Sequence, residues 1–319
     1  MPAPRYLVTG AAGFIGSAIA RTLLAQGHAV RGLDNFATGR HENVADLKHL
    51  DFMEGDLAEP KVAAAACAGV HCVFHEAAIP SVPRSVADPA GTHRANVTAT
   101  LELLVATRDA GVRRLVYAAS SSAYGNPPTL SQREDMLPDP LSPYAAAKLA
   151  GEHYLRSFHA IHGLPTVALR YFNVFGPRQD PNSPYSGVLA KFITLMLAGK
   201  TPVVDGDGEQ SRDFIYIDDV VRANLLAATA PEKGVAGRVF NIATGVRTTV
   251  NEVVAQLRTL TGYRAEVRHG PPRTGDVKHS LADISLARRD LGYEPQVDFA
   301  TGLARTVAWY RQSLTGAAS

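Results

Sequence analysis

The sequence has little cysteine and little net charge. Only Cys67 and Cys72 occur among its 319 residues, and no cluster of histidines accompanies them. That usage argues against a disulfide framework or a zinc site, and it predicts two reduced thiols packed in a core with no metal bound. A formal net charge of +2 supplies no field that would attract nucleic acid or an anionic membrane. We therefore expect neither as a partner.

Long hydrophobic runs are absent as well. No apolar stretch reaches the ~18 residues of a membrane span. A strand-like segment begins at Arg5, which leaves no room for a signal peptide, so we expect a cytoplasmic protein. What is present is ordinary for a soluble enzyme, with 46% hydrophobic and 19% charged residues. The length exceeds one comfortable core and predicts one large domain or two linked domains.

Short apolar runs alternate with helical segments through the first half of the chain. "RYLVTG" reads as a strand, and in "FIGSAIARTLLAQGH" the apolar residues Ile15, Ile19 and Leu23 recur at helical spacing. The alternation continues to "PTVALRYFN", with short glycine-containing joints, and the strand cores are apolar throughout. The sequence therefore predicts an α/β fold built on a Rossmann-type, doubly wound parallel sheet.

The alternation breaks after Asn173. "VFGPRQDPNSPYSG" is rich in Pro, Gly and Asn and reads as a loop, after which helices and short strands resume. "RDFIYIDDVVRANLLAATA" reads as a strand, an aspartate cap and a helix. We predict a sheet domain over residues 1–173, with returns from about 214–246, and a smaller C-terminal α/β substrate domain over residues 174–319.

Three glycines follow the first strand. Gly10, Gly13 and Gly16 in "VTGAAGFIG" have the spacing at which glycines permit a tight turn, close approach of the backbone to a pyrophosphate, and close helix packing. With a strand before it and a helix after it, the loop predicts dinucleotide binding. Asp34 ends the second predicted strand, where a carboxylate can bind an adenosine ribose and repel a 2′-phosphate, which favours NAD over NADP. Nearby Arg40 weakens that preference, and a plain turn residue is the alternative role of Asp34.

A tyrosine and a lysine recur at helical spacing further along. "SPYAAAK" places Tyr144 and Lys148 on one face of a helix. A free tyrosine has a pKa near ~10, too high for a base at neutral pH. A neighbouring ammonium, together with an oxidised nicotinamide, would favour the phenolate. A surface pair of an aromatic ring and a cation is the alternative, but the dinucleotide loop and the hydroxyl run that starts at Ser120 favour chemistry.

With these motifs the chain resembles the extended short-chain dehydrogenase/reductase family, and most closely its nucleotide-sugar 4-epimerases. The resemblance covers "TGAAGFIG", "SSSAYG", "SPYAAAK", "RYFNVFGPRQ", "GDGEQSRDFIYIDD" and "RTGDVKHSLADI". It implies a UDP-hexose 4-epimerase with tightly held NAD, whose catalytic residues are Ser120, Tyr144 and Lys148. Tyr144 would remove the O4 proton while hydride leaves C4, and the 4-keto sugar would turn over before hydride returns to its other face.

The resemblance also implies the binding residues. It assigns the cofactor to Gly10, Gly13, Phe14, Ile15, Gly16, Asp34, Asn35, Thr38, Gly39, Asp56, Leu57, Ala77, Ala78, Asn96, Ala118, Tyr144, Lys148 and Tyr171. It assigns the UDP-sugar to Ser81, Ser120, Ser121, Ser122, Tyr144, Asn173, Arg212, Arg273, Asp276 and Ser280. Arg212 and Arg273 resemble diphosphate ligands, with surface ion pairing as their alternative, and Asp276 resembles the ligand of the uridine ribose.

The serine run narrows the reaction. A 4,6-dehydratase needs an acid and a base beside the sugar, and related dehydratases place Asp and Glu directly after the catalytic hydroxyl. Here those positions are Ser121 and Ser122, which are neither acid nor base at neutral pH. The sugar is narrowed by Ser280, where some relatives carry a tyrosine that excludes 2-acetamido sugars. A serine leaves volume for UDP-N-acetylglucosamine and UDP-N-acetylgalactosamine, with UDP-glucose and UDP-galactose also possible.

Three alternatives stay open. A UDP-glucuronate 4-epimerase or decarboxylase would use the same three catalytic residues. A non-catalytic, NAD-binding scaffold protein is expected to have lost Tyr144 or Lys148, and both are present. An NADP-linked reductase would consume added cofactor, whereas an epimerase would not. Family members are often homodimers that pair two helices from each subunit, and by resemblance residues 98–111 and 144–159 would supply them here.

Overall fold

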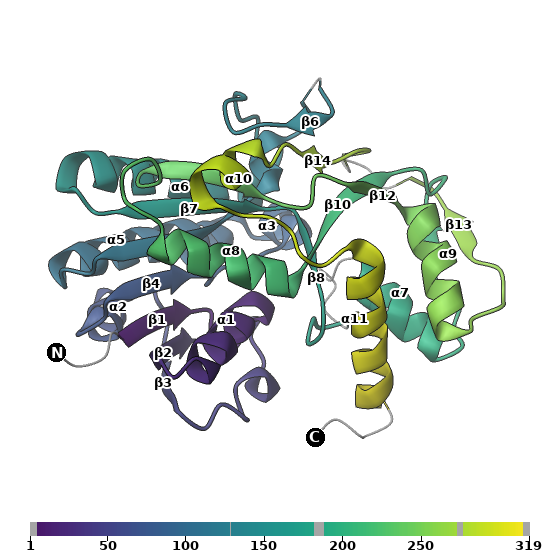
Figure 1. The fold of residues 1–319 in the computed structure, drawn as a ribbon, viewed down its shortest axis with the longest axis horizontal. Helices are drawn as coiled ribbons and strands as arrows, with labels where there is room; N and C mark the ends of the chain where they lie inside the picture. The colour runs from purple at the N-terminus through teal and green to yellow at the C-terminus, as the bar shows by residue number, and fades with distance from the viewer. Residues whose placement is uncertain (1–4, 128, 182–187, 273–276, 315–319) are drawn as a thin grey trace.

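The computed structural model describes residues 5–127, 129–181, 188–272 and 277–314. Its main sheet has seven parallel strands in the order β11-β7-β5-β4-β1-β2-β3 (Figure 1). Their bounds are β1 Arg5–Thr9, β2 Ala29–Asp34, β3 Leu50–Glu54, β4 Cys72–His75, β5 Arg114–Ser120, β7 Thr166–Tyr171 and β11 Arg238–Ile242. The strand order reverses between β1 and β4, as in a doubly wound fold, so the predicted fold class is confirmed.

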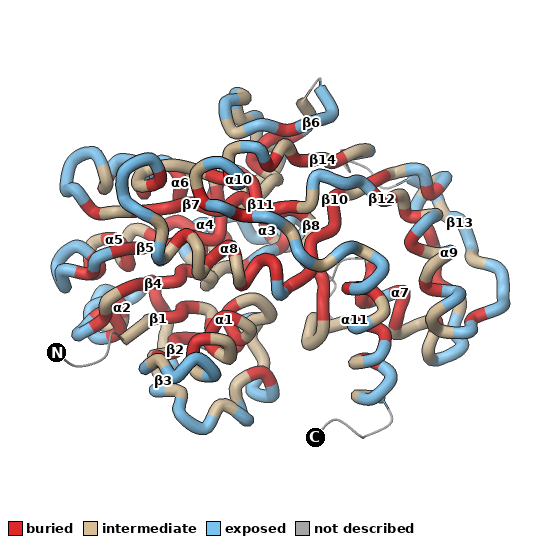
Figure 2. The backbone as a smooth tube through the Cα atoms, viewed as in Figure 1, coloured by how far each residue is buried: buried red, intermediate tan, exposed pale blue. Residues whose placement is uncertain are grey.

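Helices cover both faces of this sheet. They are α1 Phe14–Ala25, α2 Pro60–Cys67, α3 Val82–Ala87, α4 Pro89–His93, a π-helical turn Arg94–Thr98, α5 Ala99–Asp109, α6 Pro143–His162 and α8 Ile217–Thr229. Because neighbouring strand residues point to opposite faces, Val8 packs in one cluster with Ile19 of α1, while Leu7 packs in another with Leu103 of α5. Buried positions accordingly run along the strands and the inner sides of the helices (Figure 2).

The elements toward the right in Figure 1 form a second region beside the sheet. They are β8 Asn173–Phe175, α7 Val188–Leu197, β9 Val203–Asp205, β10 Ser211–Tyr216, β12 Arg247–Thr249, α9 Val250–Thr261, β13 Arg268–Gly270 and α11 Phe299–Leu314. The short strands β6 Ser131–Gln132 and β14 Leu281–Ala282 pair with each other at the top of that view, and α10 Ser285–Leu291 packs against β11 and α8. Short 3₁₀ turns occur at His41–Asn43 and Ser121–Tyr124. Helix α9 begins at a capping box in which Thr249 and Glu252 bond reciprocally. Apolar residues of α7, α9 and α11 continue the α1-side core, so the two regions share one cluster.

The chain crosses between the regions more than once. Strand β10 pairs in parallel with β8 in the second region. The chain then returns through α8, which packs beside α1, and through β11, which adds the edge strand next to β7. Residues 217–242 therefore lie with the sheet, although they follow Asn173 in the sequence.

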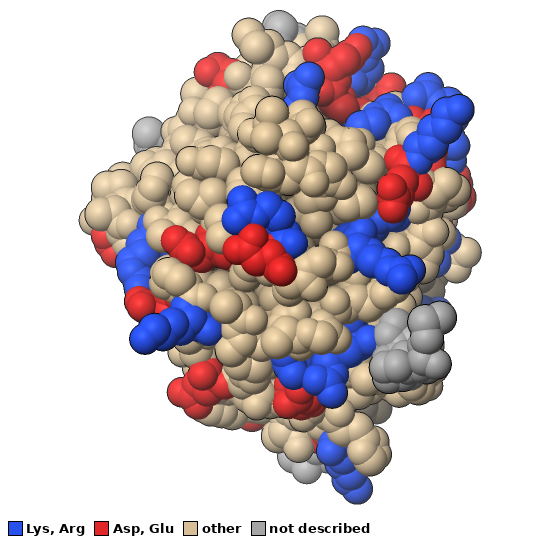
Figure 3. Space-filling view, turned by 90° about the vertical axis from the view of Figure 1, so that its left-hand side faces the viewer, with Lys and Arg blue, Asp and Glu red and all other residues tan. Residues whose placement is uncertain are grey.

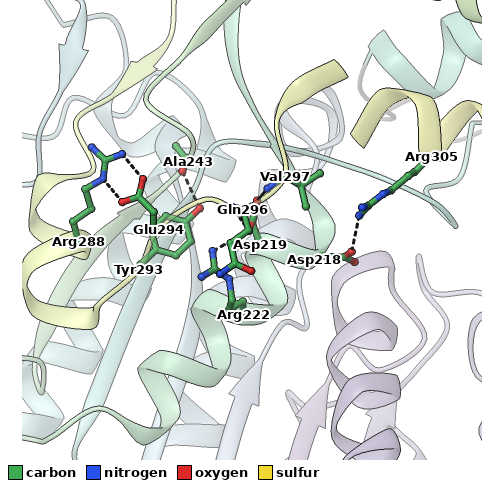
Figure 4. A network of polar contacts seen from close by, with 10 residues as sticks. All are labelled: Asp218, Asp219, Arg222, Ala243, Arg288, Tyr293, Glu294, Gln296, Val297 and Arg305. Atoms are coloured by element: carbon green, nitrogen blue, oxygen red, sulfur yellow. Dashed lines mark hydrogen bonds and ion pairs between the residues drawn. The ribbon is translucent and has the colours of Figure 1, made fainter. Parts of the chain in front are cut away.

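Helix α8 does not begin at the predicted aspartate cap. Its N-cap is Tyr216, whose side chain makes no capping bond. Asp219 instead accepts the backbone N–H groups of Gln296 and Val297 at 2.9 and 3.0 Å, and it pairs with Arg222 (Figure 4). Hydrogen bonds to a nearly fully buried carboxylate are strong, so this contact fastens the segment that leads into α11 onto α8.

Candidate functional site

A cavity of about 1370 Å³ opens where the strand order reverses, and it extends from the ends of β1, β4 and β5 to α7 and β10. In a doubly wound sheet, this crevice outside the carboxyl ends of the strands is where ligands bind. Its described lining draws on both regions, so a ligand there would touch the sheet domain and the second region together.

The glycine loop forms one wall of this cavity. Gly10 has a φ of +66°, and a Cβ there would be 2.7 Å from the amide nitrogen of Ala77. A Cβ on Gly16 would overlap the carbonyl of Gly10. Helix α1 begins at Phe14, and its N-cap Gly13 offers no side-chain cap. Residues of its first turn line the cavity, and uncapped N–H groups at a helix N-terminus suit a pyrophosphate.

Asp34 lies at the end of β2, where the adenosine ribose of a dinucleotide would be bound. Its carboxylate accepts the N–H groups of Ala12 and Phe36 at 2.9 and 2.8 Å. Burial raises the pKa of this carboxyl, and the same backbone bonds oppose the rise. Arg40 forms ion pairs with Glu42 and Asp180 rather than with Asp34. The carboxylate thus keeps lone pairs for a ribose diol.

Most of the predicted cofactor residues line the cavity. They are Gly10, Gly13, Phe14, Ile15, Gly16, Asp34, Asn35, Thr38, Leu57, Ala77, Ala78, Ala118, Tyr144, Lys148 and Tyr171. Gly39, Asp56 and Asn96 are not among the lining residues. A Cβ on Gly39 would crowd the Asp34 carboxylate, Asp56 is paired with Arg94, and the Asn96 amide bonds the backbone of Ile79 in both directions. In this structure the side-chain contacts of Asp56 and Asn96 are therefore with other residues of the protein, and neither residue lines the cavity.

The three predicted catalytic residues all line this cavity. Ser120 ends β5, and Tyr144 and Lys148 come from the first two turns of α6, which starts at the side-chain cap of Ser142. Burial raises the pKa of the Tyr144 phenol, and a hydrogen bond with Ser120 lowers it. The Ser122 hydroxyl donates to Ser120 Oγ at 2.8 Å, and Ser122 is not among the residues that line the cavity. Ser122 therefore orients the Ser120 hydroxyl.

Lys148 lies against the strand beneath it. Its Nζ donates to the carbonyl of Ala118 at 2.7 Å and lies 5.0 Å from the ring centre of Tyr117. Burial lowers the pKa of this ammonium to about 8, against the pull of the Glu76 and Glu152 carboxylates. Burial raises the pKa of Tyr144, and the expectation that the Lys148 ammonium and an oxidised nicotinamide together favour the phenolate stays a prediction. The positive charge of an oxidised nicotinamide is the further contribution that the phenolate needs.

Sequence reasoning missed several charged groups that line the cavity, among them Arg178, Lys191 and Glu76. Glu76 directly follows β4 and lines the same cavity as Tyr144. The Tyr171 hydroxyl donates to its Oε1 at 3.0 Å and itself accepts from Asn224 Nδ2 at 2.7 Å. Burial raises the pKa of Glu76 to about 7, while the bond from Tyr171 and the charge of Lys148 oppose the rise. A charged residue directly after a buried strand was the signal that could have found it.

The predicted sugar and diphosphate residues are only partly gathered. Ser120, Tyr144, Asn173 and Arg212 line the cavity, whereas Ser81, Ser121, Ser122 and Ser280 are not among its lining residues. Ser81 caps α3 by accepting the N–H of Arg84 at 3.0 Å. The N–H of Ser280 donates to the carbonyl of Ser211 at 3.0 Å, directly beside Arg212. The predicted ligands Arg273 and Asp276 lie outside the described residues.

The described residues show neither a metal cluster nor a membrane-spanning helix. Among the described residues, no group of three or more His, Cys, Asp or Glu side chains could hold a metal ion. Both cysteines are buried, and burial raises their thiol pKa values to about 11 and about 12. No described helix is long and apolar enough to cross a bilayer. On the face drawn in Figure 3, acidic and basic side chains are interspersed rather than gathered by sign.

Known proteins share this chain's sequence and fold. A profile of the NAD dependent epimerase/dehydratase family matches residues 6–243. A UDP-glucose 4-epimerase of Mycolicibacterium smegmatis is 42% identical over 312 residues, covering 96% of this chain and 98% of that protein. A UDP-glucuronate 4-epimerase of Thermodesulfobacterium geofontis is 34% identical, covering 97% of each. A solved UDP-N-acetylglucosamine 4-epimerase from Methanobrevibacter ruminantium, in complex with UDP-N-acetylmuramic acid, is 40% identical with a TM-score of 0.93, covering 98% of this chain and 100% of that one.

Proposed function

Since the chain belongs to the NAD dependent epimerase/dehydratase family and is an NAD-dependent 4-epimerase of UDP-sugars, we propose that it interconverts gluco and galacto UDP-hexoses with the N-acetylated pair as its preferred substrates. UDP-glucose and UDP-galactose are then slower substrates. The proposal has two parts. The type of reaction is inferred from the three consecutive serines, and the preferred substrate is inferred from the small residue at position 280.

Each described residue of the site has a part in that reaction. NAD, when bound, supplies the acceptor and later the donor of the hydride at the sugar C4. Tyr144 Oη takes the O4 proton and afterwards gives it back, and Ser120, which is hydrogen-bonded to Tyr144, would bond the same O4 atom. Lys148 keeps a positive charge beside the reacting atoms. The glycine loop and Asp34 would hold the pyrophosphate and the adenosine ribose.

The arrangement of the serines is the observation that carries the reaction type. Dehydration to a 4-keto-6-deoxy sugar requires an acid and a base at C5 and C6, next to the catalytic hydroxyl. The two positions after Ser120 hold serines, neither is among the described lining residues of the cavity, and Ser122 is engaged with Ser120. The 4-keto sugar then has one outcome, which is the return of hydride to either face.

The substrate preference is supported by residue 280. Ser280 is held against Ser211, whose neighbour Arg212 lines the cavity. By resemblance, position 280 faces the sugar, and a serine there leaves volume for a 2-acetamido group that a tyrosine would fill. The 40% identical structure from Methanobrevibacter ruminantium is named for UDP-N-acetylglucosamine, which also supports the proposal.

The test compares three substrates in parallel. Purified protein is incubated with UDP-N-acetylglucosamine, UDP-glucose and UDP-glucuronate, the products are separated, and denaturation releases bound NAD for assay. Faster turnover of the N-acetylated sugar is expected, and equal or slower turnover would overturn the preference. Ser280→Tyr should lower the N-acetyl rate by about tenfold relative to UDP-glucose, whereas the matched Ser280→Ala, which stays small, should not.

UDP-glucuronate is the second candidate substrate. Arg84 and Arg178 line the cavity and offer cations for a sugar carboxylate. Galacturonate formation in the same assay would favour this alternative, and release of carbon dioxide with a pentose product would favour decarboxylation. A homodimer stays a prediction, and light scattering of the purified protein would test it.

A further inference from the structure

Four charged side chains gather at and beneath the catalytic centre. Lys148 and Arg170 are cations, and Glu152 and Glu76 are the carboxylates near them. Arg170 and Glu152 bind each other through two hydrogen bonds of 2.7 and 2.9 Å, and both side chains are 4% exposed. Arg170 and Glu152 therefore form a buried contact ion pair in which each side chain neutralises the charge of the other.

Glu76 and Lys148 do not form a contact ion pair of this kind. Within the described part of the chain, no carboxylate lies within 4.0 Å of Lys148 Nζ, which donates to the Ala118 carbonyl instead. Glu76 keeps one carboxylate oxygen for Tyr171 and is partly open to the cavity. Above its pKa, Glu76 therefore places in the cavity a negative charge that no contact ion pair matches, and this charge is available to act on a bound ligand.

The position of this carboxylate is fixed by a chain of hydrogen bonds. Asn224, which is fully buried in α8, donates to the Tyr171 hydroxyl at the end of β7. Because the hydroxyl oxygen already accepts from Asn224, its proton is directed to Glu76 Oε1. Three elements that are far apart in the sequence thus hold one carboxylate at the floor of the cavity.

We propose that Glu76 is a positioning residue whose charge makes the protein bind NAD⁺ more tightly than NADH. The inference rests on the proposed function only in placing the nicotinamide beside Tyr144, where hydride must be exchanged with the sugar. The oxidised nicotinamide ring carries one positive charge and the reduced ring carries none. A carboxylate in the wall of the same cavity therefore stabilises the oxidised form selectively.

The preference would serve a reaction without net redox change. In the first half, the C4–H bond of the sugar breaks, hydride reduces the cofactor, and the O4 proton moves to Tyr144. In the second half, the same hydride and proton return, so atoms and charge balance over the cycle. A protein that favours the oxidised cofactor speeds the return of hydride and shortens the life of the keto sugar, whose escape would leave a reduced and inactive protein.

The test measures cofactor preference without any sugar. Purified protein is incubated with excess NAD⁺ and NADH in equal amounts until exchange is complete, then desalted and denatured, and the two forms are quantified. We expect the wild-type protein to be enriched in NAD⁺ and Glu76→Gln to lower the bound NAD⁺/NADH ratio by about tenfold. Glu76→Asp, which keeps the charge, should recover most of the wild-type ratio.

The variants separate charge from structure. An amide oxygen at position 76 can still accept the Tyr171 proton, so a purely structural role predicts an unchanged ratio in Glu76→Gln, and that result would overturn the proposal. A wild-type ratio near one would overturn it too. The exposed Glu59, paired with Arg94, gives the control variant Glu59→Gln, for which no change is expected. A protein that prefers NAD⁺ but epimerises no sugar would contradict the proposed function alone.

Discussion

The two carboxylates that act on Lys148 have opposite surroundings. Glu152 sits in α6 beneath the cavity, where Arg170 closes over it with two hydrogen bonds. Glu76 sits at the end of β4 in the cavity wall, where a neutral phenol is its described hydrogen-bond donor. Both carboxylates favour the charged form of the same ammonium, but only one of them is neutralised by a contact ion pair.

The comparison separates charges that support the fold from charges that do chemistry. A buried ion pair costs desolvation on both sides and is tolerated when the two partners satisfy each other. A carboxylate left without a cation in contact raises the free energy of the empty site, and a cationic ligand recovers that free energy on binding. Removing a charge from the buried ion pair should reduce stability. Removing the unpaired carboxylate should change which ligands the site binds.

Breaking the closed pair should have the largest effect. Glu152→Gln leaves Arg170 buried without a carboxylate, so the free energy of unfolding should fall by about 3–5 kcal/mol. Urea unfolding of the cofactor-loaded protein measures it. The double variant Glu152→Gln, Arg170→Met removes both charges and should regain part of the loss. A double variant less stable than the single variant would show that the cation–π contact of Arg170 with Tyr124 matters more than its charge.

Changes on the cavity side should affect turnover and leave stability nearly unchanged. Ser120→Ala removes a hydroxyl that bonds Tyr144, and turnover should fall by about a hundredfold. Ser122→Ala removes only the donor that orients Ser120, and turnover should fall by about threefold. Initial rates of sugar epimerisation test the pair, with unfolding curves as the control. Equal losses in the two variants would contradict this division of roles.

His75, the residue before Glu76, provides a test of how the stability of the protein core depends on pH. His75 is fully buried between Thr9 and Thr100, and burial lowers its pKa to about 3, with Lys148 adding to the effect. A lowered pKa in the folded state means that its stability contribution is complete above pH 6.5 and is lost as the pH falls toward 3. Between pH 7 and pH 5 the free energy of unfolding should drop by about 2 kcal/mol from this group. His75→Asn should flatten that dependence, and an unchanged slope would assign it to other groups.

The smallest effect should come from neutralising the open carboxylate. Burial raises the pKa of Glu76 to about 7 in the folded protein, so ionisation costs stability as the pH rises from 4.5 through 7. Without cofactor at pH 8, Glu76→Gln should be more stable than wild type by about 1 kcal/mol, a figure reduced for the partial exposure of the group. The gain should shrink toward pH 5. A loss of stability at pH 8 would place Glu76 with Glu152, among the charges that support the fold.

Motifs in which the key residues lie a few positions apart in the sequence allowed much of the candidate site to be predicted. The glycine loop needs only one strand and one helix, and Tyr144 and Lys148 need only one helical turn, so short patterns locate them. The cap predicted for α8 was wrong because Asp219 is recruited by backbone amides 77 and 78 residues away. The contacts of Glu76 depend on β4, β7 and α8 meeting in space, which no short pattern encodes. Arg273 and Asp276 stay predictions.

The return of the chain to the sheet also bears on how such a protein can be divided. A fragment that stopped at residue 173 would lack β11 beside β7 and α8 beside α1, so one edge of its sheet and much of the apolar surface of one face would be open to water. Exchange of substrate specificity between relatives by a single crossover would join mismatched halves of one core. A working chimera requires three junctions, one near residue 173 and one on each side of the segment 217–242.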